Sequence, residues 1–316
     1  MSRLLIASQL NEVFNRAFAE QSPEAEILPV PAGLPLELPT EAKVLIAAPF
    51  RKAGGALPAA PPPGWPFDLR WVQLISVGID FYPDWLFQGP VVTSARGASA
   101  VALAEFALAA IFAEAKRLPD IWIDRHEAWT PTPIRLVQGQ TLGLVGFGSI
   151  GEALAPRAQA LGLEVLAVRR SETPFGAPGV TRAADLGELF ERSDIVVLAA
   201  PATAQTHHLV NRELLGRAKP GLHLINVARG ALIDDEALLE ALDGGRVGLA
   251  SLDVTHPEPL PAGHRYYDHP RVRLSPHTSV HTPDTRQNLA TQFARNLARF
   301  RQGAPLEGVI DPGRGY

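Results

Sequence analysis

The feature that most constrains this chain is a glycine-rich turn between a short apolar run and a helical pattern. Gly146, Gly148 and Gly151 form G-x-G-x-x-G directly after the apolar run at 141–145. Gly146 permits a tight turn, Gly148 lets the backbone approach a pyrophosphate, and Gly151 allows the following helix to pack closely. The free N–H groups and positive dipole end of that helix favour phosphate oxygens. The turn therefore predicts dinucleotide binding in a βαβ unit.

Apolar runs alternate with helical patterns from this turn onward. The strands are expected at 141–145, 164–168, 195–198, 222–227, 247–252 and 272–274. The helices are expected from the turn to 161 and at 184–192, 211–217 and 234–242. Such alternation is typical of successive βαβ units. We therefore predict an α/β protein with a Rossmann-type, doubly wound parallel sheet.

The first 95 residues follow a different pattern, in which apolar runs are separated by Pro-rich loops. The runs lie at 4–7, 44–47, 72–75 and 91–93. They indicate a smaller α/β domain, which a helix from the N-cap candidate Ser99 to just before Pro119 would leave. A last helix at 284–301 would return the chain to it. We expect a substrate domain of residues 1–97 and 282–316, a dinucleotide-binding domain of residues 98–281, and a cleft between them.

Composition excludes several classes of function. The chain has no cysteine, so neither a disulfide nor a thiol nucleophile can form. Its net charge of -4 is spread without blocks of one sign, which argues against a nucleic-acid partner. The longest apolar stretch, 98–115, contains Glu105 and Glu114 and is shorter than the roughly 20 residues that span a bilayer. We expect no membrane association and a cytoplasmic location.

The end of the second strand of the Rossmann-type sheet predicts which cofactor is preferred. An acid that binds the ribose 2′-hydroxyl is usual there, but this chain has Arg169 and Arg170, and no carboxylate before Glu172. Two guanidiniums can bind a 2′-phosphate through charge-assisted hydrogen bonds, which favours NADP(H). A solvated arginine pair that tolerates either cofactor is the alternative, so NAD(H) stays open.

Three candidate catalytic residues follow the ends of predicted strands. Arg229 could hold a substrate carboxylate with its planar guanidinium, and the imidazole of His277 could exchange a proton with a C2 oxygen. Glu258 could stabilise a protonated imidazole, with His256 as a rival base beside it. Because parallel strands end at one edge of a sheet, these side chains are expected to meet.

These segments closely resemble the D-isomer-specific 2-hydroxyacid dehydrogenase family. The resemblance covers 76–281 and is strongest at 143–151, 224–237 and 251–261. It implies a glyoxylate/hydroxypyruvate reductase-like enzyme that transfers a hydride between NAD(P)H and C2 of a small 2-keto or 2-hydroxy acid, with D-specificity. It also implies a Rossmann-type domain inserted into a flavodoxin-like one, and a homodimer formed mainly through the dinucleotide-binding domain.

The resemblance assigns the site residues one by one. Arg229 would bind the substrate carboxylate, Glu258 would orient His277, and His277 would be the general acid and base. Val77 and Gly78 would hold the same carboxylate from the first domain. To the residues already expected to bind the cofactor from their own pattern, the resemblance adds Ala200, Pro201, Thr206, Val227 and Ala228 as its lining and Asp253 as the residue facing the nicotinamide amide. The residues expected from their own pattern are Gly146, Gly148, Ser149, Ile150, Gly151, Arg169 and Arg170, and Arg169 replaces the family's usual acid, which puts a preference for NAD(H) in doubt.

Several alternatives stay open or fail on the residues themselves. Arg96 could read the substrate or could be a hinge or surface arginine. His277 and His281 have the spacing of two metal ligands but lack a third at helical spacing, so no metal is expected. A non-catalytic protein that senses NAD(P) is the rival function, and the joint presence of Arg229, Glu258 and His277 argues against it. A Tyr-x-x-x-Lys alcohol dehydrogenase fails because the pattern is absent.

Overall fold

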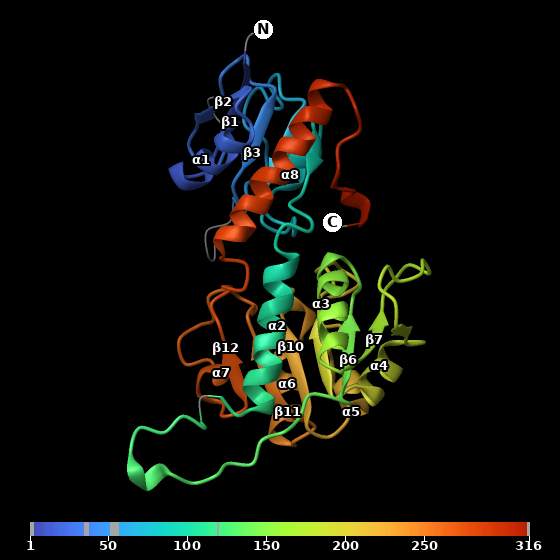
Figure 1. Cartoon of the computed structure of the whole chain (residues 1–316). Coiled ribbons are helices and arrows are strands. Elements are labelled where there is room, and N and C mark those ends of the chain that lie inside the picture. Colours follow the sequence, from blue (N-terminus) through green and yellow to red (C-terminus); the bar gives the residue numbers. More distant parts are fainter. Residues whose placement is uncertain (1–2, 35–37, 51–56, 119, 315–316) are drawn as a thin grey trace. The chain divides into compact units, whose positions relative to one another are not determined.

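The chain forms two compact units, seen in a computed structural model that describes residues 3–34, 38–50, 57–118 and 120–314 (Figure 1). The first unit consists of Met1–Ser99 and His281–Tyr316, and the second consists of Ala100–Val280. The second unit is therefore an insertion in the sequence of the first. None of the helices in the described ranges combines the length and apolar character that a membrane crossing requires.

The first unit contains a five-stranded parallel sheet in the order β2-β1-β3-β4-β5. This 2-1-3-4-5 order is that of flavodoxin-like folds. The strands are β1 (Leu4–Ser8), β2 (Ala25–Pro29), β3 (Val44–Ala47), β4 (Trp71–Leu74) and β5 (Val91–Thr93). The helices are α1 (Glu12–Gln21) and α8 (Pro283–Arg301), with short 3-10 turns at Asp84–Phe87 and Pro312–Arg314.

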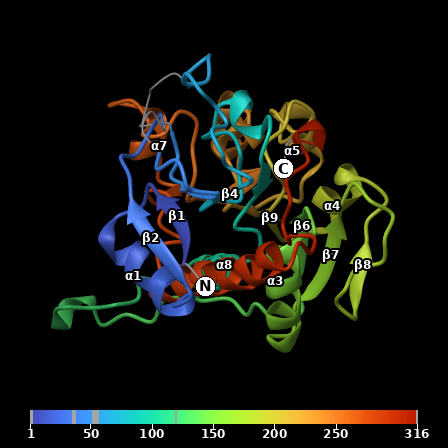
Figure 2. The ribbon, with the colours of Figure 1, turned by 90° about the horizontal axis from the view of Figure 1, so that it is seen from above.

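This sheet is buried on both faces, because alternate residues of its strands enter two different cores. In β3, Val44 and Ile46 belong to one core, whereas Leu45 and Ala47 belong to the other. The first core is covered by α1 and α8, which lie side by side (Figure 2). Strands buried on both faces read as continuous apolar runs, which is why most of them are visible in the sequence.

The second unit contains a seven-stranded parallel sheet in the order β12-β11-β10-β9-β6-β7-β8. Its strands are β6 (Thr141–Val145), β7 (Glu164–Val168), β8 (Val180–Arg182), β9 (Ile195–Leu198), β10 (Leu222–Asn226), β11 (Val247–Leu252) and β12 (Val272–Leu274). Counted along this unit, the order is 3-2-1-4-5-6 with one further strand, the dinucleotide-binding arrangement. The predicted fold class, a Rossmann-type sheet inserted into a smaller flavodoxin-like domain, is confirmed.

The helices of the second unit cover both faces of its sheet. They are α2 (Ala100–Ala115), α3 (Ser149–Ala160), α4 (Leu186–Arg192), α5 (Arg212–Arg217), α6 (Asp235–Asp243) and α7 (Arg265–Asp268), with 3-10 turns at His126–Ala128 and Gly230–Leu232. Leu103 of α2 and Leu154 of α3 enter one core, and Leu189 of α4 and Leu238 of α6 enter the other. The strand order reverses between β6 and β9, so ligands are expected at the carboxyl ends of these strands.

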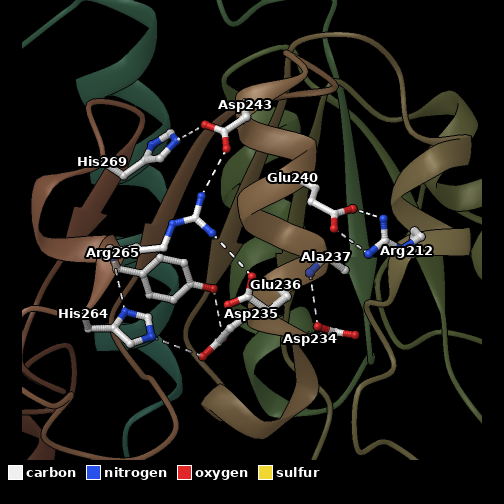
Figure 3. Close-up of polar contacts among 11 residues, drawn as sticks. Arg212, Asp234, Asp235, Glu236, Ala237, Glu240, Asp243, His264, Arg265 and His269 are labelled. Carbon is white, nitrogen blue, oxygen red and sulfur yellow. Dashed lines mark hydrogen bonds and ion pairs between the residues drawn. The ribbon is translucent and has the colours of Figure 1, made fainter.

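Three helices, α4, α5 and α6, begin one or two residues after their predicted starts because a polar side chain caps each of them. Asp185 accepts a hydrogen bond from the backbone N–H of Glu188, and Asn211 and Asp234 cap α5 and α6 in the same way. Figure 3 shows Asp234 and its partner, the N–H of Ala237. The residues predicted as helical therefore serve as N-caps.

The long predicted helix ends earlier than expected, at Ala115. Arg117 adopts a left-handed φ of 54°. The N–H of Leu118 then donates to the carbonyl oxygen of Ala113, and the N–H of Arg117 donates to that of Glu114. This is a Schellman motif, which satisfies the last carbonyl groups of a helix without extending it. Pro119, the predicted stop, lies outside the described residues.

Candidate active site

The glycine-rich turn joins β6 to α3 at the point where the strand order reverses. Gly146 has a φ of +95°, and a Cβ atom there would lie 2.8 Å from the carbonyl oxygen of Ala199 and from the backbone nitrogen of Ala200. The N–H of Ala199 donates to the carbonyl oxygen of Val145 at 2.8 Å. Only glycine tolerates both this backbone conformation and this close approach. Gly146 therefore fixes the turn against the loop that follows β9.

The start of α3 leaves room for a ligand. Gly148 is the N-cap residue, no side chain caps the helix, and a Cβ atom at Gly148 would meet no atom within 4 Å. The first N–H groups of α3, which begin with Ser149 and Ile150, are thus without the side-chain cap that other helices here have. The bare helix start and the open space beside Gly148 fit the pyrophosphate of a dinucleotide.

Gly151 has a more local role than the one predicted from its position in the motif. A Cβ atom there would lie 2.9 Å from the ring of Phe147, so glycine makes room for this aromatic residue of the turn. The Phe147 ring in turn contacts the ring of Phe175, with centroids 4.5 Å apart. The glycine-rich turn is therefore packed against the loop that follows β7.

The loop after β9 is closed by one threonine. The hydroxyl of Thr206 donates to the carbonyl oxygen of Pro201 at 2.7 Å and accepts from the N–H of Thr203 at 2.7 Å. Ala200 and Pro201 lie at its start, and the backbone of Ala200 lies beside Gly146. These bonds hold the loop in shape at the switch point, where the sequence places cofactor contacts.

Arg169 is held at the end of β7 by carbonyl oxygens. Its guanidinium donates to the carbonyls of Thr173 at 2.5 Å, Pro174 at 3.0 Å and Phe147 at 3.4 Å. Arg170, next along the chain, is exposed. The carboxylate usual at this place is absent, so the described partners of Arg169 leave its positive charge uncompensated.

The turn after β10 positions Arg229 through a residue that the sequence prediction missed. Asn226 is fully buried; its side-chain oxygen accepts from the N–H of Ala228 at 3.0 Å, and its side-chain nitrogen donates to the carbonyl oxygen of Arg229 at 2.8 Å. Val227 and Ala228 are also buried. An asparagine at the end of a buried strand is a signal for such a turn. The guanidinium of Arg229 is half-buried and donates to the carbonyl oxygen of Ala228 at 2.7 Å.

Gly230 brings the turn of Arg229 against the loop that carries Glu258. A Cβ atom at Gly230 would lie 2.0 Å from the carbonyl carbon of Thr255 and 2.4 Å from the nitrogen of His256. No side chain fits between the two backbones. Sequence reasoning missed this residue because the contact is between segments about 25 positions apart, and nothing in the local pattern indicates it.

Glu258 and His277 form a hydrogen-bonded pair. Nδ1 of His277 lies 2.8 Å from Oε2 of Glu258, and the other carboxylate oxygen accepts from the N–H of Thr255 at 3.0 Å. Burial raises the pKa of Glu258, but the bond and charge of His277, the Thr255 N–H and the charge of Arg229 together hold it below its ordinary value. The three predicted residues therefore interact, and Glu258 is kept ionised. His256, the rival base, is exposed.

Asp253 fastens the turn that carries His277. Its buried carboxylate accepts from Ser275 Oγ at 2.6 Å, from the N–H of Thr278 at 2.9 Å, and from both the N–H and the hydroxyl of Ser279. Four donors use the lone-pair sites of a carboxylate. His277 itself has a φ of +51°, an unusual conformation for a non-glycine residue that is typical of functional sites. The contact of Asp253 with a nicotinamide amide stays a prediction.

The far end of the Glu258 loop is anchored to α6 by a buried tyrosine. The hydroxyl of Tyr266, in α7, donates to the carboxylate of Asp235 at 2.9 Å. Arg265 forms ion pairs with Glu236 and Asp243, also on α6 (Figure 3). Both ends of the segment from 253 to 264 are thus tied down, which limits how far Glu258 can move.

The predicted substrate residues of the first unit lie at the carboxyl end of β4. Val77 is exposed, and the carbonyl oxygen of Gly78 accepts from Ser76 Oγ at 2.7 Å. Arg96 follows β5, and its carbonyl oxygen accepts from the side chain of Gln292 in α8 at 3.0 Å. Within the described ranges, no group of three or more His, Asp or Glu side chains has the arrangement of a metal site.

The comparisons with known proteins point to one family. Residues 108–279 match the family model described as "D-isomer specific 2-hydroxyacid dehydrogenase, NAD binding domain". A glyoxylate reductase from Thermofilum pendens is 36% identical over 257 residues, which cover 78% of this chain and 74% of that protein. A D-3-phosphoglycerate dehydrogenase from Bacillus subtilis is 34% identical over 71% of this chain, but the match spans only 43% of that longer relative.

A solved structure resembles the whole chain. It is a D-isomer specific 2-hydroxyacid dehydrogenase from Xanthobacter autotrophicus Py2 in complex with NADPH and MES, with 26% sequence identity and a TM-score of 0.80. The alignment covers 100% of both chains. The likeness therefore extends over both units, beyond the range that the family model matches.

Proposed function

We propose that this chain, which belongs to the D-isomer specific 2-hydroxyacid dehydrogenase family, reduces small 2-keto acids at C2 to D-2-hydroxy acids and prefers NADPH as hydride donor. Membership makes it an NAD(P)-dependent 2-hydroxyacid oxidoreductase. Our proposal goes beyond family membership in three points, which are the direction of the reaction, the D-specificity and the cofactor preference. The observation that supports the proposed reaction at C2 most is the Glu258–His277 pair beside Arg229, at the edge of the sheet where such folds bind ligands.

The residues at the switch point fit a nicotinamide dinucleotide. The bare start of α3 and the open space at Gly148 suit its pyrophosphate. When bound, NADPH would supply the hydride for C2. The remaining predicted contacts follow β9 and β10, whose carboxyl ends lie at the same edge of the sheet as the glycine-rich turn after β6. They are Ala200, Pro201, Thr206, Val227 and Ala228.

We assign His277 as the general acid for the keto oxygen. Its Nδ1 is engaged by Glu258, which leaves Nε2 as the ring nitrogen that would give a proton to the oxygen at C2. The ionised carboxylate of Glu258 stabilises the protonated imidazole and fixes the orientation of the ring. In the oxidation of a hydroxy acid, the same nitrogen would take the proton back.

We assign Arg229 to the substrate carboxylate. A guanidinium offers five N–H donors in one plane, which suits a carboxylate and the keto oxygen beside it. Asn226 and Gly230 hold its backbone on both sides, so the group is preorganised. Val77 and Gly78, in the loop after β4, stay a prediction as substrate-binding residues of the first unit.

The preference for NADPH is supported by Arg169, which stands where an acid would bind the ribose 2′-hydroxyl of NADH. Its described partners are carbonyl oxygens, so an anion such as the 2′-phosphate would complement its charge. The relative from Xanthobacter autotrophicus was solved with NADPH.

The test is the rate of cofactor oxidation with a panel of 2-keto acids that runs from glyoxylate to phenylpyruvate, with NADPH and with NADH. The proposal predicts turnover with at least one small member, a higher kcat/KM with NADPH, and a product of D configuration on chiral chromatography from members other than glyoxylate, whose product glycolate is achiral. An L product or a preference for NADH would contradict the corresponding part, and tight nucleotide binding without any turnover would favour a sensor.

We also propose a homodimer formed through the second unit. The segment between α2 and β6, which Figure 1 shows reaching out from the sheet of that unit, exposes 69% of Trp122, 77% of Trp129 and 71% of Leu136. Large apolar side chains exposed on one segment favour its burial against a second copy of the chain. The double variant Trp122→Ala/Trp129→Ala should sediment as a monomer, whereas Tyr267→Ala, which removes another exposed aromatic side chain, should stay dimeric. A wild-type monomer would contradict the proposal.

A further inference from the structure

A second arginine lies beside Arg169 and was not expected from the sequence. Arg182 is the last residue of β8, and it pairs in register with Ala167 of β7, two residues before Arg169. The guanidiniums of Arg169 and Arg182 both donate to the carbonyl oxygen of Thr173, at 2.5 Å and 2.8 Å. The two positive charges therefore converge on one atom.

An aromatic ring holds the same two guanidiniums. The Cζ atom of Arg182 lies 4.6 Å from the centroid of the Phe175 ring, and that of Arg169 lies 5.3 Å from it. The negative face of an aromatic ring attracts a guanidinium and leaves many of its N–H donors available. Phe175 is itself packed on Phe147 of the glycine-rich turn. The arginine pair is thus fixed relative to the start of α3.

The pair has no anionic partner among the described residues. The bonds of Arg169 and Arg182 all go to neutral carbonyl oxygens, of Phe147, Thr173 and Pro174. In addition, the buried Nε atom of Arg169 has no hydrogen-bond partner in the described part of the chain. Two like charges brought together without a counter-charge repel each other, so an anion bound between them would be stabilised.

We propose that Arg182 is a second binding residue for the 2′-phosphate of NADP(H), acting together with Arg169 and with Phe175 holding both in place. This rests on the NADPH preference proposed above. The place of the arginine pair agrees with this role, because dinucleotide-binding folds hold the adenine ribose at the end of the strand that corresponds to β7. Arg182 thereby determines cofactor specificity from β8, whereas the residue that usually indicates the cofactor preference lies at the end of β7.

The experiment compares two nucleotides that differ only in the phosphate at issue. Adenosine 2′,5′-bisphosphate and adenosine 5′-monophosphate are titrated calorimetrically into the full-length wild type and into Arg182→Gln. We expect the wild type to bind the bisphosphate more tightly than the monophosphate. Arg182→Gln should bind the bisphosphate about tenfold more weakly than the wild type does, because one charge-assisted contact is lost, and its affinity for the monophosphate should be unchanged. Arg182→Lys, which keeps the charge, should lie between the two.

A matched control is Arg192→Gln, which removes an arginine of the same unit that pairs with Glu188 on α4. It should leave both affinities unchanged. If Arg182→Gln keeps the wild-type preference, or weakens both ligands equally, the role of Arg182 is wrong and the residue only shapes the loop. If the wild type itself binds the two nucleotides equally well, the proposed NADPH preference is wrong, and the role of Arg182, which rests on it, is wrong with it.

Discussion

Nδ1 of His277 lies 2.8 Å from Oε2 of Glu258, although the two residues follow different strands of the sheet. The pairing depends on two supports. Asp253, at the end of β11, binds the turn of His277 through its carboxylate, and Gly230 lets the turn after β10 lie against the backbone at Thr255. The acid–base pair is thus built from three neighbouring strand ends, with Arg229 beside it.

Replacing Glu258 by Gln should lower kcat more than it raises KM. The amide keeps the size of the side chain but cannot stabilise the protonated imidazole. A hydrogen bond to a charged group contributes about 1.5–3 kcal/mol, so we expect a fall in kcat on the order of 10- to 100-fold. Steady-state kinetics with NADPH and the 2-keto acid that the wild type reduces fastest measure it. Glu213→Gln, an exposed change on α5, should have no effect; equal kcat in both variants would show that Glu258 does not act on His277.

Replacing Gly230 by Ala should displace the loop of Glu258. A Cβ atom there would overlap the backbone at Thr255, at 2.0 Å from its carbonyl carbon. Overpacking of this kind costs typically 1–3 kcal/mol and occasionally more, and we expect about 3 kcal/mol or more here. The free energy of unfolding, measured in urea, and kcat should both be lower than in the wild type. The control is Gly216→Ala in α5, where a Cβ atom would meet nothing within 4 Å. Equal stability of the two variants would contradict the packing argument.

Replacing Arg169 by Asp should shift the cofactor preference toward NADH. The acid can accept hydrogen bonds from the ribose hydroxyl and repels a 2′-phosphate. Losing one or two charge-assisted bonds and adding repulsion should change the NADPH/NADH ratio of kcat/KM by about 100-fold. The substrate KM should stay constant, because Arg169 lies at the end of β7 and not at the substrate residues. An unaltered ratio would remove the basis of the NADPH assignment.

His223 should make the protein less stable in acid. Burial, with a further contribution from Arg135, lowers the pKa of His223 to about 3 from the ordinary value of 6.5. Between these values the unfolded chain binds a proton that the folded chain does not, so lowering the pH favours unfolding by up to about 1.4 kcal/mol per pH unit. The loss therefore begins as the pH falls through 6.5 and continues toward the folded value.

The check is the free energy of unfolding in urea at a series of pH values from about 7 to about 5. His223→Gln, which retains a polar group for Ser251 Oγ but does not titrate, should show a smaller dependence on pH than the wild type. Identical slopes in the two proteins would show that the buried histidine does not control acid stability.

The sequence predicts the sheets and the acid–base residues well for a physical reason. Strands buried on both faces leave continuous apolar runs, and parallel strands end at one edge, so Arg229, Glu258 and His277 could be expected to meet. The supports could not be predicted, because Gly230 and the Asp253 bonds are contacts between distant segments. Arg182 was missed because β8 is short and only partly buried, and so has no apolar run.

The edges of the first sheet illustrate the same limit. β2 has a single buried residue and ends at Pro29, so no apolar run marks it. The helix α1 was missed as well, although Asn11 caps it and Glu12 lies in its first turn. Those capping signals are typical of a helix start and could have been used.

A proton transfer by His277 during reduction at C2 can be tested by removing the imidazole and keeping the cofactor site intact. The rate of NADPH-dependent reduction is measured for the wild type and for His277→Ala across the panel of 2-keto acids, and NADPH affinity is titrated on the same preparations. We predict a fall in kcat on the order of 10²- to 10⁴-fold with unchanged NADPH affinity. Equal turnover in the two proteins would contradict the assignment of His277, and a wild type that binds NADPH without any turnover would contradict the proposed activity itself.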